Sequence, residues 1–363
     1  MKKEKKSIIS PFTILSFLLF IVACVIYIAT DMSYAFADSV NEGVAWAFRR
    51  FMASISGVFD FSLFELLIIS IPIILFFIIR RAIKCFSLRE GRIRFILNIA
   101  AVALLLYTGH IFALGIGHNT TPISVRMELD EVEVTEENLA EELINLGEEI
   151  NSLANAVPRN ENGIFDPEYS YKELSEKITD SYESLVEKNN LPKNFSSRAK
   201  GVKNGWAMSY LGITGIYTYY TGEANVNTSY PAYVTVFTAA HEMCHQRGIL
   251  RENEANFVAY LITSTSDDPS LRYSAAMEMY EYFASALYRT NKDLYYEIHA
   301  LLSPLAREDM RAASLVTQKY GDTFIEDISD WINNLYLESS GSGGIVSYSR
   351  VVHLVLAYNE KNK

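Results

Sequence analysis

The sequence predicts a mainly α-helical (α+β) protein, in which three transmembrane helices precede a mostly helical domain with a small β-sheet or hairpin. Three observations predict this fold class. The first 117 of the 363 residues contain three long apolar stretches, the remainder repeats apolar residues at helical spacing, and one short segment is rich in Thr, Tyr and Gly. We therefore expect two parts, a membrane anchor at 1–117 and a separate domain at 118–363.

The two parts differ in charge. Residues 1–117 contain 12 Lys and Arg against 7 Asp and Glu, whereas residues 118–363 contain 20 against 36. A domain this acidic repels phosphate backbones, so the composition argues against a nucleic-acid partner. The lipid bilayer is the first partner that the sequence predicts.

Each apolar stretch is long enough to cross a bilayer, which needs about 20 helical residues. The stretches cover about 8–29, 61–79 and 93–117. Lys and Arg are retained on the cytoplasmic side of a membrane, and they cluster at the N-terminus and between the second and third stretches, not in the loop between the first two. We therefore predict a multi-pass protein of the cell membrane, with a cytoplasmic N-terminus and an extracytoplasmic C-terminal domain.

The first apolar stretch has a second interpretation. Ala35-Phe36-Ala37 resembles the small-x-small site at which a signal peptide is cleaved. The apolar run is longer than the core of a usual signal peptide, which favours a retained helix. With either interpretation, the C-terminal domain reaches the outer face of the membrane.

Helices dominate the expected outer domain. Apolar residues recur at helical spacing over 135–157, with Thr135 as the N-cap, and a second helix is expected over 167–188. The segment 213–227 is the best strand candidate. Further helices are expected at 232–246, 252–263, 271–289, 292–302, 306–320, 324–338 and 347–359.

The helix after the predicted strand contains the pattern H-E-x-x-H, formed by His241, Glu242 and His245. The two histidines lie about 40° apart and one turn along the same face, which is the arrangement that two imidazoles need to bind one ion. Glu242 lies about 60° beyond His245, within reach of a water on that ion. Two solvated histidines are the alternative, but the preceding residues are apolar, and a buried helix with these side chains requires a partner for them. The predicted cofactor is Zn²⁺.

A catalytic zinc site needs a third protein ligand and one open position. Glu252 and Glu254 both follow the predicted chain reversal at Gly248. On a helix Glu252 shares a face with Asn256, so Glu252 could bind the metal while Asn256 hydrogen-bonds a ligand imidazole. Glu254 points about 200° away, as a solvated or arginine-paired carboxylate would. We favour Glu252 as the third ligand, and Glu254 stays open as the alternative.

The chain resembles a bacterial family of three-pass membrane proteins that is catalogued as a domain of unknown function and regarded as zinc-peptidase-like. The resemblance covers nearly the whole chain. It is carried by Gly215-Ile-Tyr, Thr221-Gly-Glu-Ala-Asn-Val-Asn, 241–248 and 252–257. More broadly, the histidine pair and its glutamates resemble the gluzincin metallopeptidases, such as thermolysin-like and CAAX-type enzymes.

The gluzincin resemblance implies that His241 and His245 are zinc ligands, that Glu252 is the third ligand and that Glu242 is the general base. It also implies hydrolysis of peptide bonds. Zinc lowers the pKa of its bound water toward 7, and Glu242 takes the proton of that water and hands it to the leaving amine. An edge strand above the metal aligns an extended peptide in such sites, and we expect residues 217–227 to supply it.

A donor to the developing oxyanion is usually also needed. Tyr348 and Arg350 are candidates, because a Gly-rich loop delivers them to the start of the last predicted helix and the family resemblance extends to them. A surface tyrosine and a helix-face arginine are the other interpretation. The predicted function is thus a membrane-anchored zinc metallopeptidase acting on a peptide or protein substrate. The alternative is a non-catalytic membrane receptor or scaffold with a structural zinc site, which prefers four ligands and has no use for Glu242.

Overall fold

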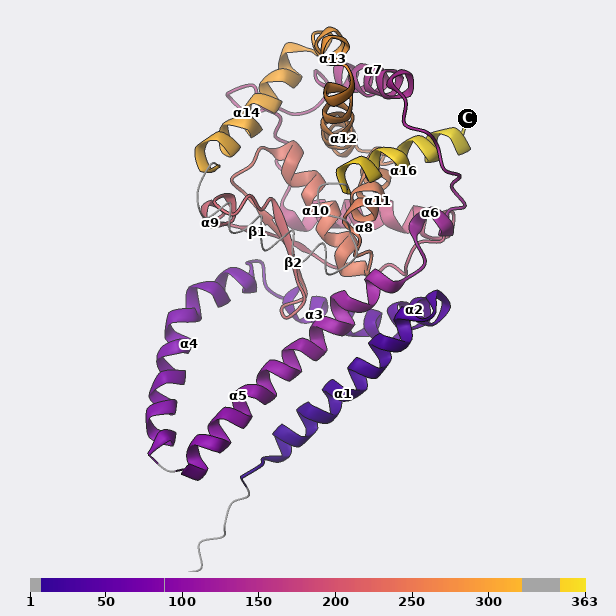
Figure 1. Cartoon of the computed structure of the whole chain (residues 1–363). Coiled ribbons are helices and arrows are strands. Elements are labelled where there is room, and N and C mark those ends of the chain that lie inside the picture. The colour runs from indigo at the N-terminus through magenta and orange to yellow at the C-terminus, as the bar shows by residue number, and fades with distance from the viewer. Residues whose placement is uncertain (1–7, 88, 322–346) are drawn as a thin grey trace, which may run out of the picture.

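Residues 8–87, 89–321 and 347–363 are described in this computed structural model. Three of the described helices are long and apolar enough to cross a membrane, the third being continued by the short helices η2 (Ile111–Gly115) and η3 (Ile116–Asn119). The three are α1 (Pro11–Asp31), α4 (Leu63–Phe86) and α5 (Arg89–His110). The second domain lies beyond one end of these helices (Figure 1). The three helices that the apolar stretches predict are confirmed.

The three long helices pack unequally. α1 and α5 lie against each other, whereas α4 stands apart from them over most of its length and buries none of its residues (Figure 1). Exposed Leu, Ile and Phe side chains surround α4 on all sides. A helix that is apolar all round and has few protein neighbours is suited to a lipid environment.

The segment between α1 and α4 is helical, and not the loop that the sequence predicted. It forms α2 (Tyr34–Val40), the π-helix η1 (Asn41–Ala45) and α3 (Trp46–Ser56), which together are called the platform below. In α3, Arg49, Ala53 and Ser56 are buried on one face, whereas Phe51 and Ile55 are exposed on another. Arg49 lies on the buried face of α3, and apolar residues lie on its exposed face, which is the reverse of the pattern of an amphipathic helix in a soluble protein.

The second domain contains a three-stranded sheet with the order β1-β3-β2. Its strands are β1 (Ala199–Val202), β2 (Gly215–Thr218) and β3 (Glu223–Asn227). β1 runs parallel to β3, and β2 runs antiparallel to β3 with Gly215 opposite Val226. The strand candidate 213–227 is therefore a hairpin. The short Ala-Lys-Gly-Val strand β1 has only one β-branched residue, so nothing in its composition predicted it.

Helices pack around this sheet and largely follow the predicted boundaries. Thr135 caps α7 in a capping box with Asn138, and Ser170 caps α8 in another with Glu173. The expected helix at 324–338 lies outside the described residues. The helices of this domain among the described residues are α6 (Ile123–Arg126), α7 (Glu136–Leu153), α8 (Tyr171–Val186), α9 (Trp206–Ser209), α10 (Ala232–Arg247), α11 (Glu252–Ser264), α12 (Pro269–Thr290), α13 (Lys292–His299), α14 (Pro304–Tyr320) and α16 (Ser347–Lys361).

Helix α10 lies at the centre of the second domain, between the sheet and helices α11 and α12 (Figure 1). Its side chains Val236, Ala239, Ala240 and Met243 are part of one hydrophobic core that joins the surrounding helices. α10 ends at Gly248, which adopts a left-handed backbone conformation with φ of 92°. Since core packing surrounds α10, the polar side chains of its last two turns are held in fixed positions.

Candidate metal centre

His241, His245 and Glu252 converge at the turn between α10 and α11. Nε2 of His241 lies 3.3 Å from one carboxylate oxygen of Glu252, and Nε2 of His245 lies 3.6 Å from the other. Donor atoms that share one zinc ion lie about 3 to 4 Å apart, because each bond is about 2 Å long. The three side chains therefore fit a single ion, and the described residues add no fourth His, Cys, Asp or Glu to the group.

The chain can bring Glu252 to the histidines because it reverses sharply at Gly248. A β-carbon at Gly248 would lie 2.4 Å from the Arg49 guanidinium and 2.7 Å from Oδ1 of Asn41, both of which belong to the platform. With φ of 92°, the position also requires a backbone conformation that side chains disfavour. Gly248 is thus needed both for the reversal and for the close approach of the platform.

The ring of His245 is oriented by the backbone that follows α10. Its Nδ1 lies 2.8 Å from the carbonyl oxygen of Ile249, which places the proton on Nδ1 and leaves the lone pair of Nε2 for a metal. For His245, this carbonyl takes the role that we expected of Asn256. Nδ1 of His241 is buried and has no hydrogen-bond partner among the described residues.

The three side chains are coupled by charge. Burial lowers the pKa of His245, but the Glu252 carboxylate outweighs burial and raises this pKa to about 9. Burial likewise opposes the charged form of Glu252, yet the two imidazoles hold its pKa well below the usual range. The carboxylate thus favours the protonated form of His245, and a metal ion competes with that proton for the same nitrogen atom.

Glu242 is buried next to the histidine pair and against β2. It accepts a hydrogen bond from the backbone N–H of Tyr217, while its Oε2 has no hydrogen-bond partner among the described side chains and backbone. A β-carbon at Gly215 would lie 2.7 Å from Oε1 of Glu242, so only glycine allows β2 to pass this closely. Burial raises the pKa of Glu242. A carboxylate with a free oxygen and a raised pKa is suited to proton transfer.

Strand β2 is an edge strand of the sheet and passes next to Glu242. Its first two residues are partly exposed, whereas Tyr217 and Thr218 are buried. Asn227 donates its N–H to the carbonyl of Thr214, so by the alternation of antiparallel pairs the backbone groups of Gly215 and Tyr217 point away from β3. The N–H of Tyr217 is used by Glu242. The expected edge strand at 217–227 is corrected by this arrangement, since β3 lies in the centre of the sheet and only the β2 half of the segment lies at an edge.

Glu254, the alternative third ligand, lies away from the cluster. Its carboxylate pairs with the guanidinium of Arg251 at 3.1 Å and accepts the N–H of Ile123 at 3.0 Å. The side chain is buried, with 5 % of its surface exposed. Glu254 therefore links α11 to the segment that leads out of the membrane anchor, as an arginine-paired carboxylate.

Of the two expected oxyanion donors, only Arg350 has a side chain among the described residues. Arg350 lies on α16 with an exposed side chain, and no ion pair or hydrogen bond joins it to the three clustered side chains in the part of the chain described. The side chain of Tyr348 lies outside the described residues. Their role as donors stays a prediction.

The backbone groups at the site could not be identified from the sequence. The Ile249 carbonyl and the Tyr217 N–H act through main-chain atoms, which any residue type supplies. The sequence did contain an indication for Gly215, because a glycine within a strand candidate often marks the close approach of another element. The sequence contained no indication for Arg49, since arginine side chains are ordinarily exposed to solvent.

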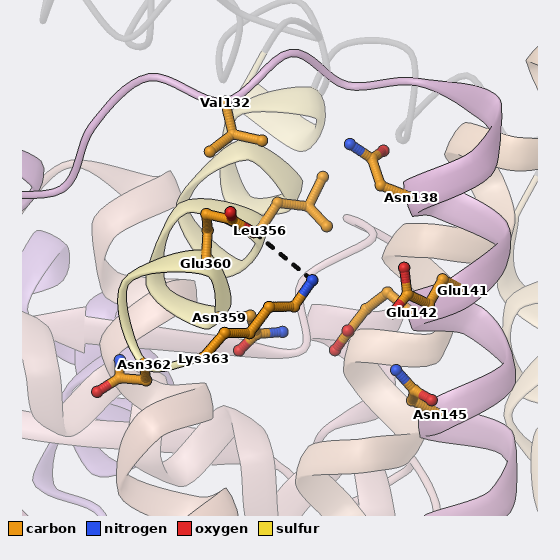
Figure 2. A pocket seen from close by; sticks show the side chains of 10 residues that line it. All are labelled: Val132, Asn138, Glu141, Glu142, Asn145, Leu356, Asn359, Glu360, Asn362 and Lys363. Carbon is orange, nitrogen blue, oxygen red and sulfur yellow. Dashed lines mark ion pairs between the residues drawn. The ribbon is translucent and has the colours of Figure 1, made fainter.

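A second polar cluster lies between α7 and α16, where a pocket of about 320 Å³ contains several carboxylates. Figure 2 shows Lys363 paired with Glu360, three residues earlier in the chain, at 3.5 Å. Glu142 is hydrogen-bonded to Asn145 and Asn359. None of the residues lining the pocket belongs to the group of His241, His245 and Glu252, which is called the histidine cluster below.

A comparison with protein-family models matches residues 41–356 to the family described as Protein of unknown function (DUF3810). The match begins in the platform and includes the sheet and the histidine cluster. Comparisons with curated proteins and with solved structures gave no match. Because the family model covers most of the chain, including α4, α5 and the second domain, this protein belongs to the DUF3810 family.

Proposed function

We propose that the protein is a membrane-anchored, zinc-dependent metallopeptidase. The observation that carries this proposal is the convergence of two imidazoles and one carboxylate on a common point, with Glu242 buried beside them. The donor set of two nitrogens and one oxygen is one that zinc accepts in hydrolytic enzymes.

Access of a substrate is compatible with this geometry. The side chain of Glu252 is 32 % exposed and that of His241 is 13 % exposed, so one side of the cluster is open. Zinc with three protein ligands polarises a carbonyl and lowers the pKa of bound water toward 7. An open side is what a catalytic site requires and a structural site lacks, which favours the peptidase over the scaffold with a structural zinc.

The chain's own residues would then act in two ways. Glu242 accepts the proton of the attacking water through its free oxygen and delivers it to the amine that leaves. The unpaired edge of β2 aligns an extended peptide by hydrogen bonds to the backbone of Gly215, where the strand is partly exposed. Peptides and proteins are therefore the proposed substrates.

The proposed orientation places the second domain outside the cytoplasm. Basic residues gather where α4 ends and α5 begins, and this end of the helices lies opposite the second domain (Figure 1). They are Arg80, Arg81, Lys84, Arg89, Arg92 and Arg94. Since short basic segments stay in the cytoplasm, the N-terminus would be cytoplasmic and the second domain extracytoplasmic.

The test compares wild-type full-length protein in detergent with Glu242→Gln on a broad peptide library. We expect hydrolysis to fall by about 10²- to 10⁴-fold, because the proton acceptor is lost, while the zinc content is unchanged. Glu142→Gln is the matched control, since it removes a carboxylate from the pocket between α7 and α16, and it should retain full activity. If the wild type holds zinc but shows no hydrolysis that depends on Glu242, the scaffold interpretation replaces this one.

A further inference from the structure

We propose that the site acts on an extended segment immediately outside the membrane anchor of a membrane-tethered polypeptide. This inference rests on the proposed peptidase function and adds the class of its substrate. It follows from three features of the structure: where the platform lies relative to the bilayer, how close the histidine cluster is to the platform, and where the open edge of β2 leads.

The platform lies at the membrane surface. It connects the end of α1 to the start of α4, and α3 exposes Phe51 and Ile55, with Arg50 and Ser54 beside them, on the side opposite its buried residues. A helix with one apolar exposed face lies in the interface between bilayer and water. Exposed large apolar residues of the platform and its flanking turns are Met32, Tyr34, Phe36, Val44, Phe51, Ile55, Val58, Phe59 and Phe61.

The opposite side of the platform holds the C-terminal end of α10. Arg49, only 1 % exposed, donates to the carbonyls of Asn41 at 2.8 Å and Arg247 at 3.5 Å. Asn41 in turn donates to the carbonyl of Gly248 at 3.2 Å. His245 precedes Gly248 by three residues, which is about 4.5 Å along a helix. The histidine cluster therefore lies within about two helical turns of the platform.

The open edge of β2 runs from the cluster to the membrane helices. Gly215 lies against Glu242, and the hairpin tip carries Tyr219, whose ring packs on His110 of α5 with ring centroids 5.6 Å apart. These two hairpin positions are four residues apart, which is about 13 Å in a strand. A β-carbon at Gly222 would lie 2.5 Å from the backbone of Met52, so the tip also rests on the platform.

Hydrogen bonds to the end of α3 and the start of α4 hold the sheet in a fixed position relative to the membrane helices. Both carboxylate oxygens of Glu223, which is fully buried, accept the backbone N–H groups of Leu63 and Phe64 at 2.9 Å, at the start of α4. Nζ of Lys200 on β1 donates to the carbonyl of Ser56 at 3.1 Å. Charged side chains that are buried in such hydrogen bonds are costly to separate, so the sheet does not swing away from the membrane.

A peptide that pairs with β2 thus lies in the layer between the cluster and the bilayer. A polypeptide with its own anchor in the same bilayer supplies residues to this layer at high effective concentration, whereas a soluble peptide has to enter it from bulk water. Hydrolysis adds one water across a C–N bond of that segment, with the hydroxyl on the carbonyl carbon and the proton on the leaving nitrogen. The four-residue reach of β2 predicts cuts within about ten residues of the anchor.

The experiment reconstitutes the wild-type full chain in lipid vesicles with three reporters that carry the same mixture of randomised segments. In the first reporter the segment directly follows a transmembrane helix. In the second a flexible Gly/Ser spacer of about 30 residues, which spans about 30 Å, separates them. The third reporter is the soluble segment alone, and mass spectrometry locates the cuts in all three.

We expect the first reporter to be cleaved at least about tenfold faster than the other two, with cuts close to the anchor. Equal rates, or cuts spread evenly along the segment, would overturn this inference while leaving the peptidase proposal intact. The Glu242→Gln chain serves as the blank. If no reporter is cleaved in a manner that depends on Glu242, the peptidase proposal fails and this inference fails with it.

Discussion

Two clusters of carboxylates in the second domain differ in what surrounds them. At the turn between α10 and α11, Glu252 faces two imidazoles on a core helix, at 3.3 and 3.6 Å. In the pocket between α7 and α16, Glu142 is hydrogen-bonded to asparagines, and Glu360 pairs with Lys363 while both stay largely exposed (Figure 2). The first cluster brings one carboxylate and two imidazole nitrogens to a common point, whereas the carboxylates of the second face amides and a lysine.

Converging donor atoms, and not acidity, distinguish the first cluster as a candidate metal site. The carboxylates between α7 and α16 are more numerous, but their neighbours are amides and an ammonium group, which compensate them. The donors at His241, His245 and Glu252 are instead fixed by a buried helix and a glycine turn. Replacing residues in each cluster should therefore have very unequal effects.

The largest expected effect is the loss of the metal in His241→Ala. The cluster would keep only two donors, and zinc affinity should fall by more than about 100-fold, because the loss of an outer hydrogen-bond partner alone costs about 10- to 100-fold. Competition with a fluorescent zinc chelator measures this affinity. A zinc affinity equal to that of the wild type would place the metal elsewhere and remove the contrast between the clusters.

The next effect concerns the platform. Arg49→Ala removes a buried guanidinium and leaves the carbonyls of Asn41, Phe112 and Arg247 without this donor, so we expect the unfolding free energy to fall by about 3 kcal/mol. Thermal unfolding of the full chain in detergent measures it. Arg311→Ala is the control, because Arg311 is 68 % exposed and its pair with Glu308 contributes about 0.5 kcal/mol or less. Similar losses in both variants would show that the platform does not hold α10.

The smallest effect is expected in the pocket between α7 and α16. Burial raises the pKa of Glu142, so its charged form costs stability once the pH exceeds this raised value. Glu142→Gln should therefore leave stability unchanged at acid pH and raise it at pH 8 by about 0.5 kcal/mol or less, without altering the zinc content. Unfolding curves at both pH values test the sign. A loss of zinc in this variant would mean that the two clusters are not independent.

Much of the fold follows from local patterns, and the rest depends on tertiary contacts. Thr135 and Ser170 begin their helices through caps that are visible in the sequence. The platform was missed because its buried face contains Arg49, whose carbonyl acceptors come from segments distant in the chain. Which face of α3 is buried depends on these distant contacts and cannot be read from the local pattern of apolar residues.

The candidate site was likewise predicted only in part from the sequence. The spacing of His241 and His245 on one helix predicts their proximity, and the short turn after Gly248 predicts that Glu252 is nearby. The expected role of Asn256 did not account for the Ile249 carbonyl, and the expected edge strand extended over both halves of a hairpin. Which main-chain group faces a site depends on strand register and turn geometry, and side-chain identity carries little of that information.

The most direct test of the metal centre is the zinc content of purified full-length protein, measured for the wild type, Glu252→Ala and Glu254→Ala. We predict about one ion per chain in the wild type and in Glu254→Ala, whose carboxylate serves Arg251 and Ile123, and almost none in Glu252→Ala. Zinc retained by Glu252→Ala and lost by Glu254→Ala, or absent from the wild type after exposure to zinc, would contradict the account.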